Sequence, residues 1–218
     1  MKNIFLNNGI IKLGLVMLIF SFYFTACSQI KSHSGISDLP IEKSNTGDKK
    51  EMSGDTSKYK KAIFASGCFW GTEYYMQKAK GVITTEVGFI GGTKDNPTYK
   101  EVCTGKTGHA EACEVTYDPD KTNYEELAKL FFETHDPTQV NRQGPDIGTQ
   151  YRTEIFYLDD EQKATAEKLI KILKDKGYDV ATKVTPATTF WKAEDYHQNY
   201  YENKNGTPYC HVYKKKFD

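Results

Sequence analysis

Hydrophobic residues recur along this chain with two periods, which separate predicted strands from predicted helices. Short apolar or alternating runs that end at turn residues predict strands over 61–66, 82–90, 110–117, 151–158 and 180–185. Apolar residues three and four positions apart predict helices over 70–80, 122–131, 160–176 and 194–201. Strands and helices alternate without a glycine-rich nucleotide loop. We therefore predict an α+β fold, a two-layer sandwich in which helices pack against a mixed sheet.

Three segments show neither period. Residues 95–108 and 135–148 hold prolines and glycines among polar residues, and both are predicted to be loops. The stretch from Glu202 onward contains a run of Asn, Gly and Pro and is predicted to be a mobile tail.

The N-terminus has the pattern of an export signal. Two lysines, Lys2 and Lys12, precede an apolar run over 13–24, which is too short to span a bilayer comfortably. The following Phe24-Thr25-Ala26-Cys27 resembles a bacterial lipobox. We expect residues 1–26 to be a lipoprotein signal peptide that is removed, and the sulfur of Cys27 to be acylated. The alternative is an uncleaved signal anchor, and in either case the rest of the protein is exported to the cell envelope.

Composition sets the limits of the folded part. Residues 27–57 are rich in Ser, Lys, Asp and Gly, and their few apolar side chains cannot offset the entropy of ordering them, so we predict a flexible tether. The folded domain is predicted to cover 58–218. Lys and Arg number 29, as do Asp and Glu, so the chain lacks the basic surface that nucleic-acid binding requires.

Cys68 lies in the run Gly67-Cys68-Phe69-Trp70-Gly71, where a predicted strand gives way to a predicted helix. The first amides of a helix lack backbone partners, and the positive end of the helix dipole favours a thiolate. We therefore expect Cys68 to be an ionised nucleophile, with Phe69 and Trp70 walling an apolar pocket beside it. The alternatives are a buried, inert thiol or a structural disulfide, since four cysteines remain once Cys27 is acylated.

Glu111 is the second candidate. Side chains alternate along a strand, so Glu111 shares a face of the predicted strand 110–117 with Cys113, Val115 and Tyr117. On an inner face, burial would raise the pKa of the carboxyl and make it a general acid near neutral pH. On an outer face it would be an ordinary exposed glutamate.

Three polar residues border the predicted loops. Tyr99 follows Pro97, Tyr151 opens a predicted strand, and Asp146 lies between them in the sequence. Phenol hydroxyls at such positions can point into a cleft, and Asp146 can orient a water or the polar end of a substrate. Packing at a strand edge and turn formation are the alternatives.

The remaining cysteines differ in their settings. Cys210, in the predicted tail, is placed to reach another sulfur, whereas Cys103 and Cys113 are interpreted as spectators, with a disulfide at Cys103 left open. His109 raises two alternatives: a nucleophilic pair with Cys68, typical of a thiol hydrolase, and a metal site with Cys103 and Cys113. Neither has the paired spacing that is typical of zinc sites.

Taken together, these residues resemble the peptide methionine sulfoxide reductase A family. The resemblance covers nearly all of Lys61–Tyr213, with motifs in the family's order and approximate spacing. The most specific motifs are GCFWG at 67–71, GHAEA at 108–112, HDPTQ at 135–139, DIGTQYR at 146–152 and AEDYHQ at 193–198.

The resemblance implies a role for each candidate. Cys68 would be the nucleophile and Glu111 the acid, while Phe69 and Trp70 would cage the methyl group of the substrate. The other implied roles are binding of the sulfoxide oxygen by Tyr99 and Tyr151, ordering of the polar side of the pocket by Asp146, and recycling by Cys210. The fold implied is an α+β sandwich related to the ferredoxin-like type.

The resemblance also implies the reaction and its partners. Family members reduce the S epimer of methionine sulfoxide, free or within proteins, without a metal or bound cofactor. The nucleophile is left as a sulfenic acid, a second thiol converts it to a disulfide, and an external dithiol such as a thioredoxin-like protein reduces the disulfide. No cysteine follows Cys210, so we expect a cycle of two cysteines. We also expect the protein to be a monomer that its lipid holds to the membrane. The alternative is that the protein is a binding module without catalytic activity, stabilised by disulfides.

Overall fold

The computed structural model describes residues 58–218. The predicted signal peptide, the acylated Cys27 and the tether lie outside the described residues. Within the described part of the chain, no helix is both long and apolar enough to cross a membrane.

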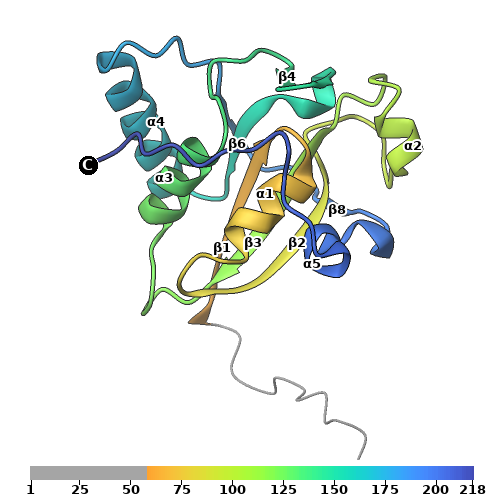
Figure 1. The fold of residues 1–218 in the computed structure, drawn as a ribbon, viewed down its shortest axis with the longest axis horizontal. Coiled ribbons are helices and arrows are strands. Elements are labelled where there is room, and N and C mark those ends of the chain that lie inside the picture. Colours follow the sequence, from red (N-terminus) through yellow and green to blue (C-terminus); the bar gives the residue numbers. More distant parts are fainter. Residues whose placement is uncertain (1–57) are drawn as a thin grey trace, which may run out of the picture. The chain divides into compact units, whose positions relative to one another are not determined.

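A mixed sheet of six strands forms the centre of the domain (Figure 1). Its strands, in spatial order, are β7 (Lys183–Pro186), β6 (Thr153–Tyr157), β1 (Lys60–Ser66), β3 (Ala110–Tyr117), β2 (Val82–Ile90) and β8 (Trp191–Lys192). Only the β6–β7 pair is parallel. A separate short hairpin joins β4 (Arg142–Gln143) to β5 (Asp146–Ile147).

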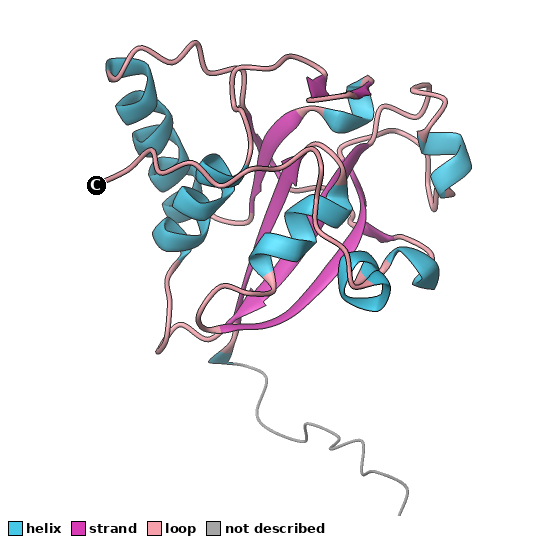
Figure 2. Cartoon of the chain, viewed as in Figure 1, coloured by secondary structure: helices cyan, strands magenta, loops and turns pink. Residues whose placement is uncertain are grey.

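Helices and sheet form the two layers of the predicted sandwich (Figure 2). The helices are α1 (Phe69–Met76), α2 (Tyr99–Val102), α3 (Tyr124–Thr134), α4 (Asp160–Asp175) and α5 (Tyr200–Lys204), with two 3₁₀ turns at Thr149–Tyr151 and Asp195–His197. The main core lies between sheet and helices, where Phe64 stacks on Phe131 with ring centroids 5.3 Å apart. A smaller cluster around Ile63 and Phe156 covers the other face. The predicted α+β fold, a mixed sheet with packed helices, is confirmed.

Several element boundaries differ from the prediction. The segment 95–108 is not all loop, because Thr98 and Glu101 form a capping box that starts α2, so Tyr99 lies on a helix. Tyr151 does not open a strand but ends a 3₁₀ turn, and β6 begins at Thr153. The first predicted helix ends at Met76 rather than at residue 80, and the strand predicted over 180–185 is observed over Lys183–Pro186. The helix predicted over 194–201 is two short turns.

The predicted mobile tail is wrong. After α5 the C-terminal segment runs past α1 and on to α3 (Figure 1). The backbone N–H groups of Lys216 and Phe217 donate to Oε1 of Glu133 at 2.8 and 3.0 Å, and the Lys216 Nζ donates to two carbonyls at the end of α3. Phe217 packs on Phe132. We call residues 205–218 the C-terminal strap. These buried polar contacts, which sequence composition does not reveal, hold Cys210 in place.

Candidate active site

Cys68 is the residue immediately before α1, at the point where β1 ends. The chain turns sharply there because Gly67 has a φ of +99°, a conformation that residues with a Cβ rarely adopt. A Cβ on Gly67 would also lie 2.4 Å from Cβ of Gln143. The glycine therefore lets the strand deliver Cys68 to the start of the helix, with its side chain only 6% exposed.

The amides at the start of α1 are already in use. The N–H groups of Gly71 and Thr72 donate to the carbonyl of Cys68, and the N–H of Phe69 donates to Oε2 of Glu111 at 3.1 Å. Only the N–H of Trp70 is left to stabilise charge on the Cys68 sulfur.

The expectation that Cys68 is ionised at rest is therefore wrong. Its hydrogen bond to Cys210, its burial and the neighbouring Glu111 all raise the pKa of the Cys68 thiol well above its usual value. The same hydrogen bond, together with His211, lowers the pKa of Cys210 to about 6. In this coupled pair, negative charge is therefore favoured on Cys210 over Cys68.

Glu111 lies on the inner face of β3 and is 1% exposed. Burial raises the pKa of its carboxyl to about 8, so it is protonated at neutral pH. Oε2 accepts the Phe69 N–H, whereas Oε1 is buried and has no partner among the described residues. The proton is therefore carried by Oε1, which is free to donate to an incoming group.

Aromatic rings line the neighbourhood of Cys68. Phe69 is fully buried and stacks on Tyr99, with ring centroids 6.2 Å apart. Trp70 is half-buried and stacks flat on Tyr200 at 3.7 Å. Phe69 is covered by its neighbours. The aromatic side chains that remain partly exposed to solvent near Cys68 are therefore those of Trp70 and Tyr99.

The two candidate phenols and Asp146 come together near Glu111. Burial and the charge of Glu111 raise the pKa values of both Tyr99 and Tyr151, so each hydroxyl keeps its proton and remains a hydrogen-bond donor. Asp146, in β5, accepts a hydrogen bond from the hydroxyl of Tyr209 at 3.0 Å. Its charge contributes to the raised pKa values of Glu111 and Tyr151. The structure thus brings the six ionisable candidates, two of them cysteines, into one electrostatically coupled group.

Sequence reasoning missed two residues that shape this group. Nδ1 of His197 accepts the indole N–H of Trp70 at 3.1 Å, and the His197 ring lies 4.3 Å from that of Tyr99. Glu194 accepts the backbone N–H of Tyr99 at 3.1 Å. Both belong to the 193–198 motif, which was a signal of family resemblance but did not reveal these contacts.

The alternatives based on the other cysteines find no support in the geometry. Cys68, Cys103, Cys113 and Cys210 are all free thiols, and Cys113 is fully buried. The ring of His109 packs against Gly92, and its Nδ1 has no partner within residues 58–218. In the same range, no group of three or more His, Cys, Asp or Glu side chains is arranged to hold a metal ion.

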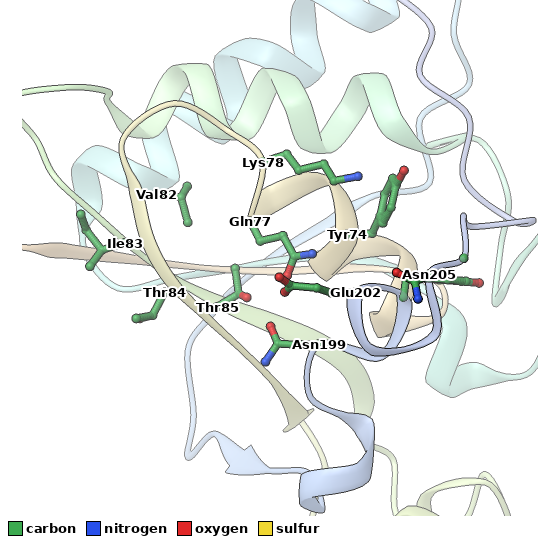
Figure 3. A pocket seen from close by; sticks show the side chains of 12 residues that line it. Tyr74, Gln77, Lys78, Val82, Ile83, Thr84, Thr85, Asn199, Glu202 and Asn205 are labelled. Carbon is green, nitrogen blue, oxygen red and sulfur yellow. The ribbon is translucent and has the colours of Figure 1, made fainter. Parts of the chain in front are cut away.

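A separate cavity of about 600 Å³ lies at the other end of α1 (Figure 3). Tyr74, Gln77 and Lys78 line it from the helix side, and Thr84, Thr85 and Asn199 from the sheet side and the loop before α5. None of the candidate catalytic residues borders it. The candidate site and this cavity are therefore distinct features of the domain.

Comparison with known proteins assigns the family. The family profile for peptide methionine sulfoxide reductase matches residues 60–218. A peptide methionine sulfoxide reductase MsrA from Deinococcus radiodurans is 55% identical over 152 residues, which are 68% of this chain and 74% of the relative. Among solved structures, Mxr1 from Saccharomyces cerevisiae in reduced form is similar with a TM-score of 0.68 and 37% identity, covering 76% of this chain and 97% of Mxr1.

Mxr1 in complex with Trx2 is similar as well, with a TM-score of 0.50 and 26% identity over 76% of this chain and 96% of that one. The fold and the family expected from the sequence motifs are thus confirmed together. The chain belongs to the peptide methionine sulfoxide reductase A family, and it is a methionine sulfoxide reductase.

Proposed function

We propose that this reductase converts methionine-(S)-sulfoxide, free or within proteins, to methionine with Cys68 as nucleophile and Glu111 as acid. The observation that carries the assignment is the buried, protonated carboxyl of Glu111, whose Oε1 has no partner within residues 58–218 although its Oε2 is bonded to the residue next to Cys68. A sulfoxide oxygen is a poor leaving group, so attack at sulfur requires a proton delivered to that oxygen.

In the first step, Cys68 attacks the sulfoxide sulfur and passes its proton to the thiolate of Cys210, with which it is hydrogen-bonded. Glu111 gives its proton to the sulfoxide oxygen, and the hydroxyls of Tyr99 and Tyr151 stabilise that oxygen. The oxygen moves to Cys68 as a sulfenic acid, and methionine leaves. Trp70 contacts the methyl group, the buried Phe69 packs beside the Trp70 ring with centroids 6.2 Å apart, and Asp146 orders the polar side of the pocket.

In the second step, Cys210 displaces the hydroxyl group from the sulfenic acid of Cys68, forming a disulfide and water. The hydrogen bond between the two sulfurs in the reduced protein supports this pairing. An external dithiol then reduces the disulfide. The complex of the related Mxr1 with Trx2 supports a thioredoxin-like protein as that reductant.

Two cysteine variants test the cycle. Cys68→Ser should abolish single-turnover reduction of methionine sulfoxide, because no sulfur is left to take the oxygen. Cys210→Ser should form about one equivalent of methionine and then stop when a thioredoxin is the only reductant. Methionine formation by Cys68→Ser would contradict the assignment of the nucleophile. Recycling at the wild-type rate by Cys210→Ser would move the resolving role to Cys103.

We also propose that the chain is exported and attached to the cell envelope membrane through a lipid on Cys27. The apolar run over 13–24 and the lipobox-like sequence that ends at Cys27 support this. The full chain expressed in a bacterium should be found in the membrane fraction, with a mass that fits cleavage before Cys27 plus an acyl modification. Cys27→Ser should leave the membrane fraction, and an unmodified, uncleaved wild-type protein would contradict the proposal.

A further inference from the structure

His211, the residue after Cys210, is buried against the start of α1. Its side chain is 2% exposed. A Cβ placed on Gly71 would lie 2.1 Å from Nδ1 of the His211 ring, and a Cβ on Gly67 would lie 3.7 Å from Cε1. The two glycines that flank the Cys68 motif therefore leave the space that the imidazole ring fills. A ring held this tightly has a fixed orientation toward its polar neighbours.

Both ring nitrogens of His211 face a partner. Nδ1 lies 3.2 Å from the sulfur of Cys210, and Nε2 lies 3.3 Å from Oγ of Ser66. Oγ of Ser66 is in turn 2.7 Å from Oγ1 of Thr72. The chain of contacts ends where Thr72 donates to the carbonyl oxygen of Cys68 at 3.5 Å.

The partners of the ring allow His211 to carry its proton on either nitrogen. A hydroxyl group can donate or accept, so Nε2 of His211 can donate to Oγ of Ser66 or accept from it. Nδ1 can therefore donate to Cys210 when that sulfur is a thiolate, and it can accept a proton from Cys210 when that sulfur is a thiol.

A base is needed at this place after the first step. In the reduced protein the thiol of Cys68 donates to Cys210 and stabilises its negative charge. Once Cys68 has given up its proton and become a sulfenic acid, that donor is gone and Cys210 is protonated. Nδ1 of His211, 3.2 Å from the Cys210 sulfur, is then positioned to accept the proton of that thiol.

We propose that His211 is the base that takes the proton of Cys210 when Cys210 closes the disulfide on oxidised Cys68, with Ser66 and Thr72 positioning its ring. The inference rests on the proposed two-cysteine function. As the proton moves to Nδ1, the bond between the two sulfurs forms and the S–O bond of Cys68 breaks. The departing hydroxide regains one proton from the imidazolium through solvent, so one sulfenic acid and one thiol give one disulfide and one water.

Other titratable groups also face Cys210 and His211, and each belongs to a different element. Asp146 in β5 opposes ionisation of Cys210, and Glu111 in β3 interacts with the Cys210 sulfur. His135, at the end of α3, stays neutral because burial lowers its pKa to about 3. The remaining neighbours that interact with Cys210 are Cys68, Tyr201 and Tyr209.

The test separates the two chemical steps. Reduced protein is mixed with excess methionine sulfoxide without a reductant, and methionine, dimedone-trapped sulfenic acid and remaining thiols are measured over time. His211→Asn keeps a polar group near Cys210 but cannot accept a proton. We expect this variant to slow disulfide closure at pH 7 at least about tenfold more than it slows formation of the one methionine per chain. The difference in closure rate between this variant and the wild type should decrease toward pH 9, where a thiol ionises without the help of a base.

Two further variants complete the design. Ser66→Ala removes the hydroxyl group that faces Nε2 of His211 and should slow closure less than His211→Asn does, without affecting methionine formation. Val212→Ala, at the exposed next residue, is the matched control and should behave as wild type. If His211→Asn also fails to form methionine, the rate of disulfide closure in Ser66→Ala becomes the deciding measurement.

The outcomes distinguish this inference from the function on which it rests. Wild-type closure rates and pH profiles in His211→Asn, or in Ser66→Ala where that variant carries the test, would overturn the role of His211 and leave the proposed function intact. A wild-type protein that forms no methionine would overturn both.

Discussion

At the scale of single residues, Glu111 has two carboxyl oxygens in different situations. One accepts the amide of Phe69, which favours the charged form, and the other is buried without a partner within residues 58–218. Burial outweighs the amide and raises the pKa to about 8, so the folded protein keeps a proton that an ordinary glutamate would have lost near pH 4.5. The acid is therefore active below pH 8 and is lost as the pH rises through that value.

Glu111→Gln should slow methionine formation at least about 100-fold, because an amide cannot deliver a proton to the sulfoxide oxygen. The wild-type rate of the first step should fall as the pH rises through about 8, and the variant should lose this dependence. Single-turnover methionine formation between pH 6 and 10 measures both. Glu114→Gln, on the opposite face of β3 and paired with Lys61, should keep the wild-type profile. An equal effect of the two variants would contradict the role of Glu111.

The two phenols permit a second prediction at this scale. Tyr99→Phe and Tyr151→Phe should each lower kcat/KM for methionine sulfoxide about 100-fold, because each removes one donor to the oxygen on which charge changes in the transition state. Tyr157→Phe, in β6 and outside the candidate site, is the control. Unchanged kcat/KM in both site variants would show that the phenols serve packing alone.

The sequence predicts which residues gather at the site better than it predicts their charges. Strand alternation places Glu111 on the same face of β3 as Cys113 and Val115, and the structure shows that this face is the inner one. The charge state of Cys68 depends on the N–H of Phe69 being taken by Glu111, which is 42 positions away, and on a sulfur in the strap. Local patterns do not reveal such contacts.

At the scale of elements, α2 and α3 offer a contrast between two helix caps. Thr98 caps the four-residue α2, which carries Tyr99 at its first position, whereas Asn123 caps the eleven-residue α3 away from the site. Asn123→Ala should lower the free energy of unfolding by about 1 kcal/mol and leave activity unchanged. Thr98→Ala should lower kcat/KM, because the Thr98 cap fixes the start of the short helix on which Tyr99 is the first residue.

Urea denaturation and steady-state kinetics on both variants test this contrast. Loss of activity in Asn123→Ala, or none in Thr98→Ala, would contradict it. The sequence contains the Thr98-x-x-Glu101 capping signature, yet α2 was missed because a four-residue helix is too short to show helical periodicity. The long α4 and the central strands, by contrast, show their periods clearly and were predicted with nearly correct bounds.

At the scale of the whole molecule, the strap joins the site to the far side of the helical layer. Its end is fixed by Glu133, which accepts two backbone N–H groups through the same oxygen, Oε1. Glu133→Ala should release the strap, slow disulfide closure and increase proteolysis after Lys214 or Lys215, with methionine formation unchanged. Glu133→Gln keeps an oxygen at that position and should show a much smaller effect. Equal closure rates in both variants would exclude anchoring by Glu133.

The anchoring of Phe217 and Lys216 also affects how the chain can be labelled. Asp218 is exposed, so a reporter joined there extends into solvent and leaves the anchor in place. Ending the chain after Val212 would keep both redox sulfurs but lower the effective concentration of one at the other. The protein labelled at Asp218 would keep its full catalytic cycle. The protein that ends after Val212 would reduce one methionine sulfoxide and then regenerate its thiols slowly.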